Sequence, residues 1–118
     1  MKRKISTICG SLRCVPKEHW DKLAKDLTLA GDLVFTVNVW DMYEFLHSEQ
    51  GVPTKHLLDK IHKQKIVLSD NVHVLHTQDN YLGSSTSSEI DFAESLDIPV
   101  HYHCVTVDCA DLRRDKVD

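Results

Sequence analysis

The chain has 118 residues, of which 42% are hydrophobic and 27% are charged, and its formal net charge is −4. This length suits one folded domain covering residues 1–118, and the acidic balance excludes a broad basic surface for nucleic acid or an anionic membrane. No apolar run approaches the roughly 20 residues that cross a bilayer, and the basic start does not lead into a signal peptide. We therefore expect a cytoplasmic protein whose four cysteines are free thiols.

The first half of the chain predicts two strands, one helix and a long loop. Residues 4–9 are a β-prone run that ends at a glycine. Pro16 opens a helix, and Gly31 ends it. Residues 33–37 form a nearly continuous apolar run, which is typical of a strand covered on both faces. Residues 38–52 predict a long loop that carries a short helix, and a loop of this length in a compact domain is more often functional than idle.

The second half predicts two more helices and two more strands. Apolar residues recur at helical spacing over 53–68 and 85–95, and short strands are predicted at 72–75 and 98–102. The hydrophobic pattern weakens after Cys104 and residues 111–118 are largely charged, so the segment 104–118 predicts an edge strand or a flexible tail. Because strands and helices alternate, we expect an α/β fold with a parallel sheet of four or five strands and right-handed crossovers.

Ligands of open parallel sheets bind beyond the carboxyl ends of the strands, near helix N-termini. The first segment at this edge is Cys9-Gly10-Ser11-Leu12-Arg13. In it Gly10 allows close backbone approach, Ser11 offers a hydroxyl, and Arg13 can bind a phosphate in a bidentate manner. The same residues equally suit a turn glycine, a cap and a solvated arginine, and the spacing alone does not choose between these interpretations.

The second segment, residues 80–89, is rich in hydroxyls and precedes a helix. Its last residue, Glu89, shares the core-facing stripe of that helix with Phe92 and Ala93. A carboxylate is costly to bury, so one hypothesis makes Glu89 a nucleophile or general base at a pocket floor. The other hypothesis is a capping box from Thr86 to Glu89, in which the glutamate bonds back to the cap amide. The spacing favours the cap, and the two hypotheses are compatible.

The third segment is the helix that carries Asp59 and His62, which are three residues apart and share a face. Together with His47, they could supply a proton donor near the same edge, although a solvated polar face is the commoner case. The chain has eight histidines, two of which, His101 and His103, lie on one side of a strand. None has the spacing typical of a zinc site, so we expect no metal.

Three motifs, in this order, resemble the nucleoside 2-deoxyribosyltransferase-like superfamily, which includes deoxyribosyltransferases and nucleoside 5′-monophosphate N-glycosidases. They cover most of residues 4–103 and read Ile8-Cys9-Gly10-Ser11-Leu12-Arg13, Lys65-Ile66-x-x-x-Asp70, and Tyr81-x-Gly83-x-Ser85-Thr86-x-x-Glu89-Ile90-x-x-Ala93. The resemblance implies a flavodoxin-like (Rossmann-like) three-layer fold. It also implies subunits that pair, as a dimer or higher oligomer, to complete one another's sites. We expect no cofactor.

The resemblance also implies roles for single residues. The carboxylate matching Glu89 attacks the anomeric carbon of the sugar, and water or a second base resolves the ester. The family's aspartate that protonates the departing base falls on His62, which can act as an acid but can equally mark a different substrate or lost catalysis. Asp59 is the alternative acid. The predicted substrate-binding set is Cys9, Gly10, Ser11 and Arg13 at the 5′ end, Trp40 and Tyr43 for stacking on a base, and Tyr81, Gly83, Ser85 and Thr86 near the sugar or phosphate.

The sequence therefore supports three hypotheses of function. The first is an N-glycosidic-bond hydrolase or 2-deoxyribosyltransferase that acts on a nucleoside or nucleotide. The second is a non-catalytic nucleotide-binding or sensing module on the same scaffold. The third is a protein-interaction domain that uses the long loop after the second strand. None of them involves nucleic acid or a membrane as a partner.

Overall fold

The computed structural model describes residues 2–37, 39 and 42–109 and shows alternating strands and helices. In the described residues, four strands form one parallel sheet in the order β2-β1-β3-β4. The strands are β1 (Ile5–Gly10), β2 (Leu33–Phe35), β3 (Asn71–Thr77) and β4 (Val100–Val105), and the helices are α1 (Lys17–Leu29), α2 (Tyr43–Leu46), the 3₁₀ helix η2 (Glu49–Gly51), α3 (Val52–Val67) and α4 (Ser84–Ser95). This is a flavodoxin-like α/β fold, and it confirms the parallel sheet predicted from the alternating pattern.

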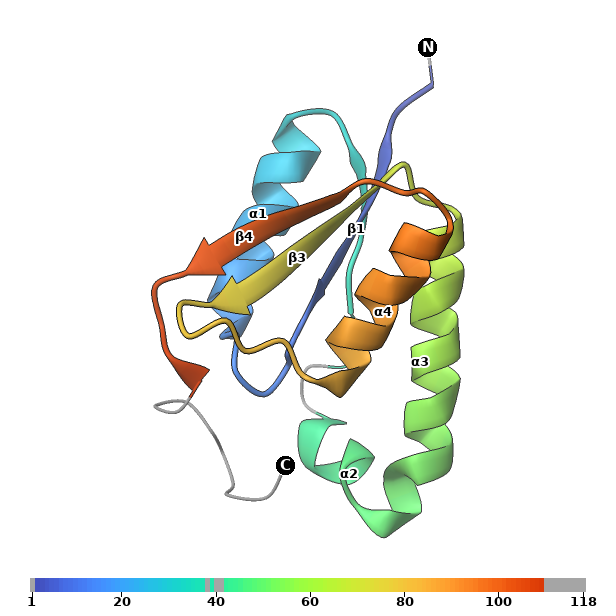
Figure 1. Cartoon of the computed structure of the whole chain (residues 1–118), viewed down its shortest axis with the longest axis vertical. Helices are drawn as coiled ribbons and strands as arrows, with labels where there is room; N and C mark the ends of the chain where they lie inside the picture. The colour runs from blue at the N-terminus through green and yellow to red at the C-terminus, as the bar shows by residue number, and fades with distance from the viewer. Residues whose placement is uncertain (1, 38, 40–41, 110–118) are drawn as a thin grey trace.

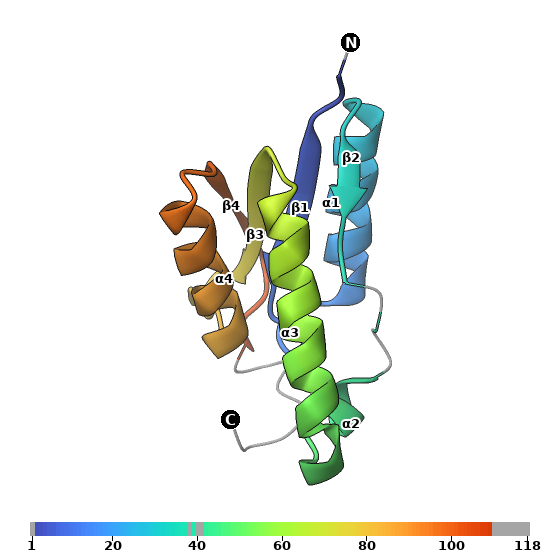
Figure 2. The ribbon, with the colours of Figure 1, turned by 90° about the vertical axis from the view of Figure 1, so that its right-hand side faces the viewer.

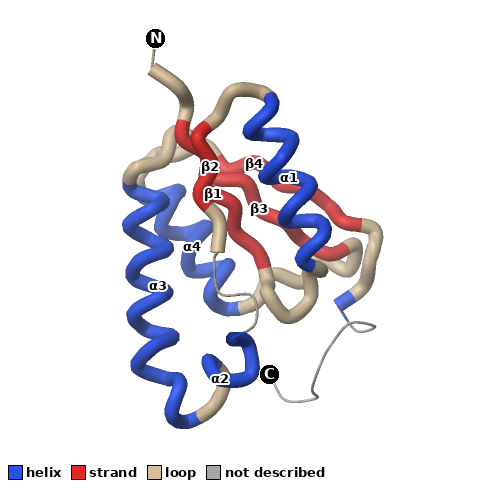
Figure 3. The backbone as a smooth tube through the Cα atoms, turned by 180° about the vertical axis from the view of Figure 1, so that it is seen from behind, coloured by secondary structure: helices blue, strands red, loops and turns tan. Residues whose placement is uncertain are grey.

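Helix α1 covers one face of the sheet, and α3 and α4 cover the other face (Figures 1, 2 and 3). Successive side chains of a strand point to opposite faces, so neighbouring residues of β1 enter different cores. Ile8 packs with Trp20 and Leu75 on the α1 side. Cys9 packs with Ile66 and the apolar residues of α4 on the other side. The three layers bring the carboxyl ends of β1 and β3, which pair in register, to the same edge.

One expectation about the elements needs correction, and one is confirmed. Among the described residues, strand β2 pairs with β1 alone and ends the sheet. Val34 packs on the α1 side, but Leu33, which points to the other face, is 55% exposed. The prediction of a strand covered on both faces is therefore wrong, because the layer opposite α1 leaves Leu33 exposed. The short helix predicted in the long loop is confirmed as α2.

The prediction of four free thiols is wrong for two cysteines. Cys14, in the loop after β1, forms a disulfide with Cys109, which follows β4 and is 95 residues away. Only the fold brings these two sulfurs together. Cys9 and Cys104 are free. Among the described helices, none combines the length and the apolar character that crossing a membrane requires, and most of the charged tail lies outside the described residues.

Candidate functional site

A cavity of about 510 Å³ opens at the carboxyl edge of the sheet. Its walls come from the loop after β1, the helices α2 and α3, and the loop that leads into α4. Figure 1 shows these segments gathered beyond the ends of β1 and β3. The lining includes the following predicted site residues: Gly10, Ser11, Arg13, Tyr43, Asp59, His62, Tyr81, Gly83, Ser85, Thr86 and Glu89. Cys9 lies behind this lining in contact with His62, and Trp40 lies outside the described residues.

The loop after β1 is held in a tight turn by its own serine. The Ser11 hydroxyl oxygen accepts hydrogen bonds from the backbone N–H groups of Arg13 (3.2 Å) and Cys14 (3.1 Å). The hydroxyl therefore serves as a local cap, as the structural interpretation of this motif expects. These two bonds use the oxygen as an acceptor, so the hydroxyl hydrogen can still be donated to a ligand.

Glycine at position 10 serves packing in the fold. A Cβ atom there would lie 3.0 Å from the Leu75 carbonyl oxygen and 3.0 Å from the Trp20 ring. Such contacts are too close for a side chain, so the fold needs glycine at this position whether or not a ligand approaches. Gly83 has a positive φ of 77°, a conformation that glycine adopts without strain, and there it starts α4.

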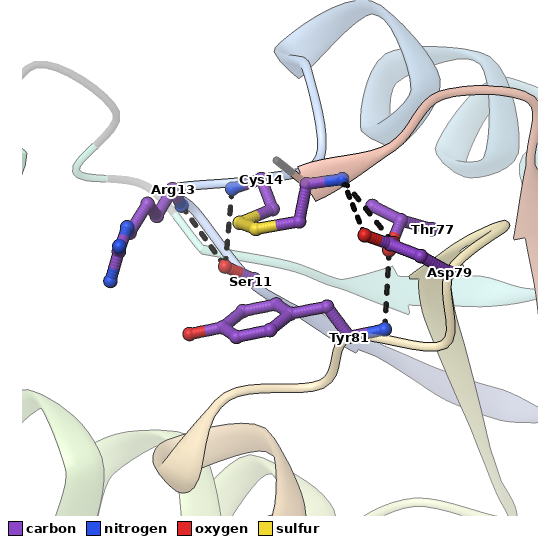
Figure 4. Close-up of a disulfide and its surroundings, with 7 residues drawn as sticks. Ser11, Arg13, Cys14, Thr77, Asp79 and Tyr81 are labelled. Atoms are coloured by element: carbon purple, nitrogen blue, oxygen red, sulfur yellow. Dashed lines mark hydrogen bonds between the residues drawn. A yellow bond between two sulfur atoms is a disulfide. The ribbon is translucent and has the colours of Figure 1, made fainter. Parts of the chain in front are cut away.

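A network behind the cavity ties the loop after β1 to the loop before α4 (Figure 4). The backbone N–H of Cys109 donates to both carboxylate oxygens of Asp79, each at 3.2 Å. Asp79 also accepts a hydrogen bond from the Thr77 hydroxyl, and the Thr77 oxygen accepts one from the Tyr81 N–H at 3.2 Å. Together with the disulfide to Cys14, this network braces the two loops that carry Arg13 and Tyr81.

The capping-box prediction for Glu89 is wrong. Helix α4 begins at Ser84 with Gly83 as its N-cap, and no side chain caps it. Because the helix starts earlier than the motif implied, Glu89 falls in its second turn, where the backbone amides already have helical partners. The carboxyl group is buried and lies 3.7 Å (Oε2) from His62 Nε2.

Three groups from three elements meet at this point: Cys9 from β1, His62 from α3 and Glu89 from α4. We call them the cavity cluster. The Cys9 sulfur is 3.4 Å from His62 Nε2, and the Cys9 sulfur, the His62 nitrogen and a Glu89 carboxyl oxygen all lie within 4.8 Å of one another. All three side chains are buried, while His62 and Glu89 also line the cavity.

Burial sets the charge state of the cavity cluster. It raises the pKa of Glu89 to about 8, with the Asp59 carboxylate adding to the effect, because a low-dielectric environment disfavours the charged form. Burial likewise lowers the pKa of His62 to about 4, with the positive charge of Lys65 adding to it. The pKa of the Cys9 thiol is raised by burial and then by Glu89. At neutral pH Glu89 therefore holds a proton and His62 is neutral, so their contact is not an ion pair.

Lys55 is a cavity residue that sequence reasoning missed. Its Nζ donates to the Asp59 carboxylate (3.1 Å) and to the Ser85 hydroxyl (2.8 Å), so it links α3 to the start of α4 and places a positive charge in the lining. The signal available was its spacing of four residues from Asp59, which places both on one helix face. Apolar side chains complete the wall, and these, too, were not predicted: Val37, Val39, Leu46, Leu58 and Leu82.

Two further predicted groups have local roles. The Tyr43 ring stacks on His47 at 4.2 Å between ring centroids, and both residues line the cavity. The motif residues Lys65 and Asp70 lie elsewhere: Lys65 Nζ donates to the Thr36 carbonyl at 2.8 Å, and the Asp70 carboxylate accepts from the Ile5 N–H at 2.8 Å. Neither residue lines the cavity; each binds the backbone of a strand or of the residue that follows one.

Comparisons with known proteins add no family to this picture. No protein-family model matches the chain, and no curated protein matches it. The geometry of the cavity and the flavodoxin-like fold therefore carry the functional argument.

Proposed function

We propose that this protein breaks the N-glycosidic bond of a nucleoside or nucleotide, with Glu89 as the nucleophile. This assigns it the chemistry of the nucleoside 2-deoxyribosyltransferase-like superfamily that its motifs resemble. One observation carries the proposal: Glu89 is a buried carboxyl group that lines a cavity together with Ser11 and Arg13. A carboxylate is costly to bury unless it has a partner or a task.

The size and the lining of the cavity suit a nucleotide. Its volume of about 510 Å³ lies within the range of roughly 300–1,000 Å³ that small-molecule sites occupy. Arg13, Lys55 and the N-terminal residues of α4 line the cavity, and such groups bind the oxygens of a 5′-phosphate. Tyr43 and the apolar wall offer a surface on which a base can stack.

The first chemical step uses the proton that Glu89 holds at neutral pH. When a bound ligand brings the Glu89 carboxyl and the His62 imidazole together, the proton passes from the carboxyl to His62 Nε2. A carboxylate beside an imidazolium remains. The carboxylate attacks the anomeric carbon, and the carbon–nitrogen bond breaks with its electron pair going to the base. His62 then donates the proton to the departing base, and a glycosyl ester of Glu89 remains. Asp59, which also lines the cavity, is the alternative acid.

The second step returns the protein to its starting state. Water adds to the anomeric carbon, the ester bond breaks, and the electron pair returns to the Glu89 oxygen. The water proton goes to neutral His62 and from there to Glu89. A second base in place of water gives transfer instead of hydrolysis. The two displacements retain the anomeric configuration.

The test is a panel of nucleosides and 5′-monophosphates with ribose and deoxyribose, incubated with the full chain in a chelator and assayed for free base by chromatography. We expect release from at least one member and a loss of about 10³-fold or more in Glu89→Gln. Glu94→Gln is the matched control, because Glu94 is exposed on the same helix. Activity that survives in Glu89→Gln would contradict the proposal.

The raised pKa of Glu89 also favours a second candidate, a nucleotide-binding module without catalysis, because a protonated carboxyl is not a nucleophile. If no compound of the panel releases base but one of them raises the melting temperature, this second candidate replaces the first. If nothing binds, both fail, and the protein-interaction hypothesis becomes the one to test. Pairing of subunits is part of the first proposal, and light scattering on the same sample measures it.

A further inference from the structure

The ligand-type atoms of the cavity cluster lie at the spacing of the ligands around one metal ion. The Cys9 sulfur and His62 Nε2 are 3.4 Å apart, and His62 Nε2 and Glu89 Oε2 are 3.7 Å apart. All three atoms lie within 4.8 Å of one another. Zinc bonds of about 2.3 Å to sulfur and about 2.0–2.2 Å to nitrogen and oxygen place tetrahedral ligands about 3.3–3.6 Å apart. The observed spacing is therefore close to that of a zinc site.

The ligand types narrow the choice of metal. A thiol with an imidazole and a carboxyl suits a borderline-soft ion such as Zn²⁺, whereas Mg²⁺ and Ca²⁺ prefer oxygen ligands. Three protein ligands leave a fourth position, and this pattern is typical of exchangeable or catalytic zinc rather than closed structural zinc. His62 and Glu89 line the cavity, so an ion bound to them is open to it. Within residues 2–37, 39 and 42–109, no other set of three such side chains converges as closely.

We propose that Cys9, His62 and Glu89 form a zinc-class metal site, and that the bound ion inhibits cleavage because it occupies the carboxylate that attacks the sugar. Cys9 binds as a thiolate and Glu89 as a carboxylate, and their two protons leave to solvent. The metal site stands on the geometry of the three ligands. The inhibition rests on the proposed function, because it needs Glu89 to be the nucleophile.

The binding test uses Co²⁺ as a spectroscopic probe, followed by its displacement with Zn²⁺. The full chain is freed of metal with a chelator, dialysed without reductant so that the disulfide stays intact, and titrated. We expect one equivalent of Co²⁺ to bind with the visible absorption of a tetrahedral site and a thiolate-to-cobalt charge-transfer band. Cys9→Ser removes this band, and Cys9→Ser and His62→Asn each weaken metal affinity by about 100-fold or more, because each removes a direct ligand.

Two variants serve as matched controls. Cys104→Ser removes the exposed free thiol, and His101→Asn removes an exposed histidine of β4 that does not line the cavity. Neither variant changes the titration. The proposal is overturned if the charge-transfer band is absent from the unmodified protein, if it survives Cys9→Ser, or if Cys104→Ser abolishes it. A zinc-dependent rise in melting temperature that is present in the unmodified protein and lost in Glu89→Gln provides a second measurement.

Measuring activity separately distinguishes the two proposals. We expect base release in chelator and its loss on adding about one equivalent of Zn²⁺. Metal binding without activity in chelator supports the metal site and contradicts the proposed glycosidase function. Activity in chelator without metal binding supports the glycosidase function and contradicts the metal site. Activity that appears only when Zn²⁺ is present overturns the inhibition.

Discussion

Two groups of polar side chains lie on opposite faces of the same sheet. The cavity cluster is buried between β1 and the helices α3 and α4. The second group, which we call the sheet-edge cluster, consists of His73 on β3 with His101 and His103 on β4. His73 Nδ1 is 2.9 Å from His103 Nε2, and the His73 ring stacks on His101 at 4.9 Å. Strand alternation places His73 on the face opposite to Val72 and Val74, which pack against α3 and α4.

Both clusters contain a histidine whose pKa is lowered to about 4, and in both the main cause is burial. Their chemistry differs. The cavity cluster joins an imidazole to a thiol and a carboxyl beside a cavity. The sheet-edge cluster holds three imidazoles, and none of them lines that cavity. A shifted pKa alone therefore does not distinguish a functional site in this protein. A stronger indication is that side chains of different chemical types converge beside a cavity. Three variants sharpen this comparison.

The largest effect is expected on the pH dependence of stability in Glu89→Gln. The pKa of folded Glu89 is about 8, so it keeps its proton up to that pH, whereas the unfolded chain releases the proton near the ordinary value of 4.5. Protonated Glu89 thus contributes stability that is full below pH 4.5 and is lost as the pH rises through 8. Glutamine does not titrate, so we expect the free energy of unfolding of the variant, relative to that of the unmodified protein, to rise by about 5 kcal/mol between pH 4.5 and pH 8.

Chemical denaturation in chelator at a series of pH values measures this gain, with Glu94→Gln as the control that shows no such trend. Asp59, Cys9, Lys63 and Lys55 affect the pKa of Glu89, and His62 Nε2 lies 3.7 Å from its carboxyl group. A stability difference between Glu89→Gln and the unmodified protein that is the same at pH 4.5 and above pH 8 would show that Glu89 ionises normally in the folded state.

The next effect separates the two clusters by activity. His62→Asn is expected to lower kcat for base release by about 100-fold, because the departing base loses its acid. His101→Asn, in the sheet-edge cluster, is expected to leave kcat unchanged. Steady-state kinetics on the best substrate of the panel measures both variants. Equal losses in the two variants would mean that histidine burial affects stability and that His62 has no chemical role.

The smallest effect concerns acid stability at the sheet edge. The pKa of folded His73 is lowered from its ordinary value of 6.5 to about 4, mainly by burial and then by His103 and His101, while Asp32 opposes the shift. Its contribution to stability is present above pH 6.5 and is lost as the pH falls toward 4. His73→Asn removes this loss. We therefore expect the free energy of unfolding of the variant, relative to that of the unmodified protein, to rise by about 1 kcal/mol as the pH falls from 6.5 to 4. This value is reduced because His73 is partly exposed to solvent.

Thermal melts at the two ends of that range, pH 6.5 and 4, measure the gain, with the exposed residue His56 changed to asparagine as the control. A gain in His56→Asn as large as that in His73→Asn would mean that general charge repulsion, rather than the packing of the three imidazoles, causes the loss of stability at low pH.

Local patterns in the sequence were enough to predict the order of the elements and the parallel sheet. Apolar runs and helical spacing depend on neighbours within a few residues, so they need no knowledge of the fold. The same patterns predicted which loops meet at the carboxyl edge, because in a parallel sheet the loop after every strand lies at that edge. Ser11, Arg13, His62 and Glu89 were predicted in this way from the sequence.

Only the tertiary structure decided what several of these residues do. The motif from Thr86 to Glu89 fits a capping box, and the start of α4 at Ser84 was needed to show that Glu89 lies instead beside Cys9 and His62. Cys9 and His62 are 53 residues apart, and the two cysteines of the disulfide are 95 apart. Contacts across such separations depend on how layers pack and not on local spacing, and for this reason no pattern along the chain predicted them.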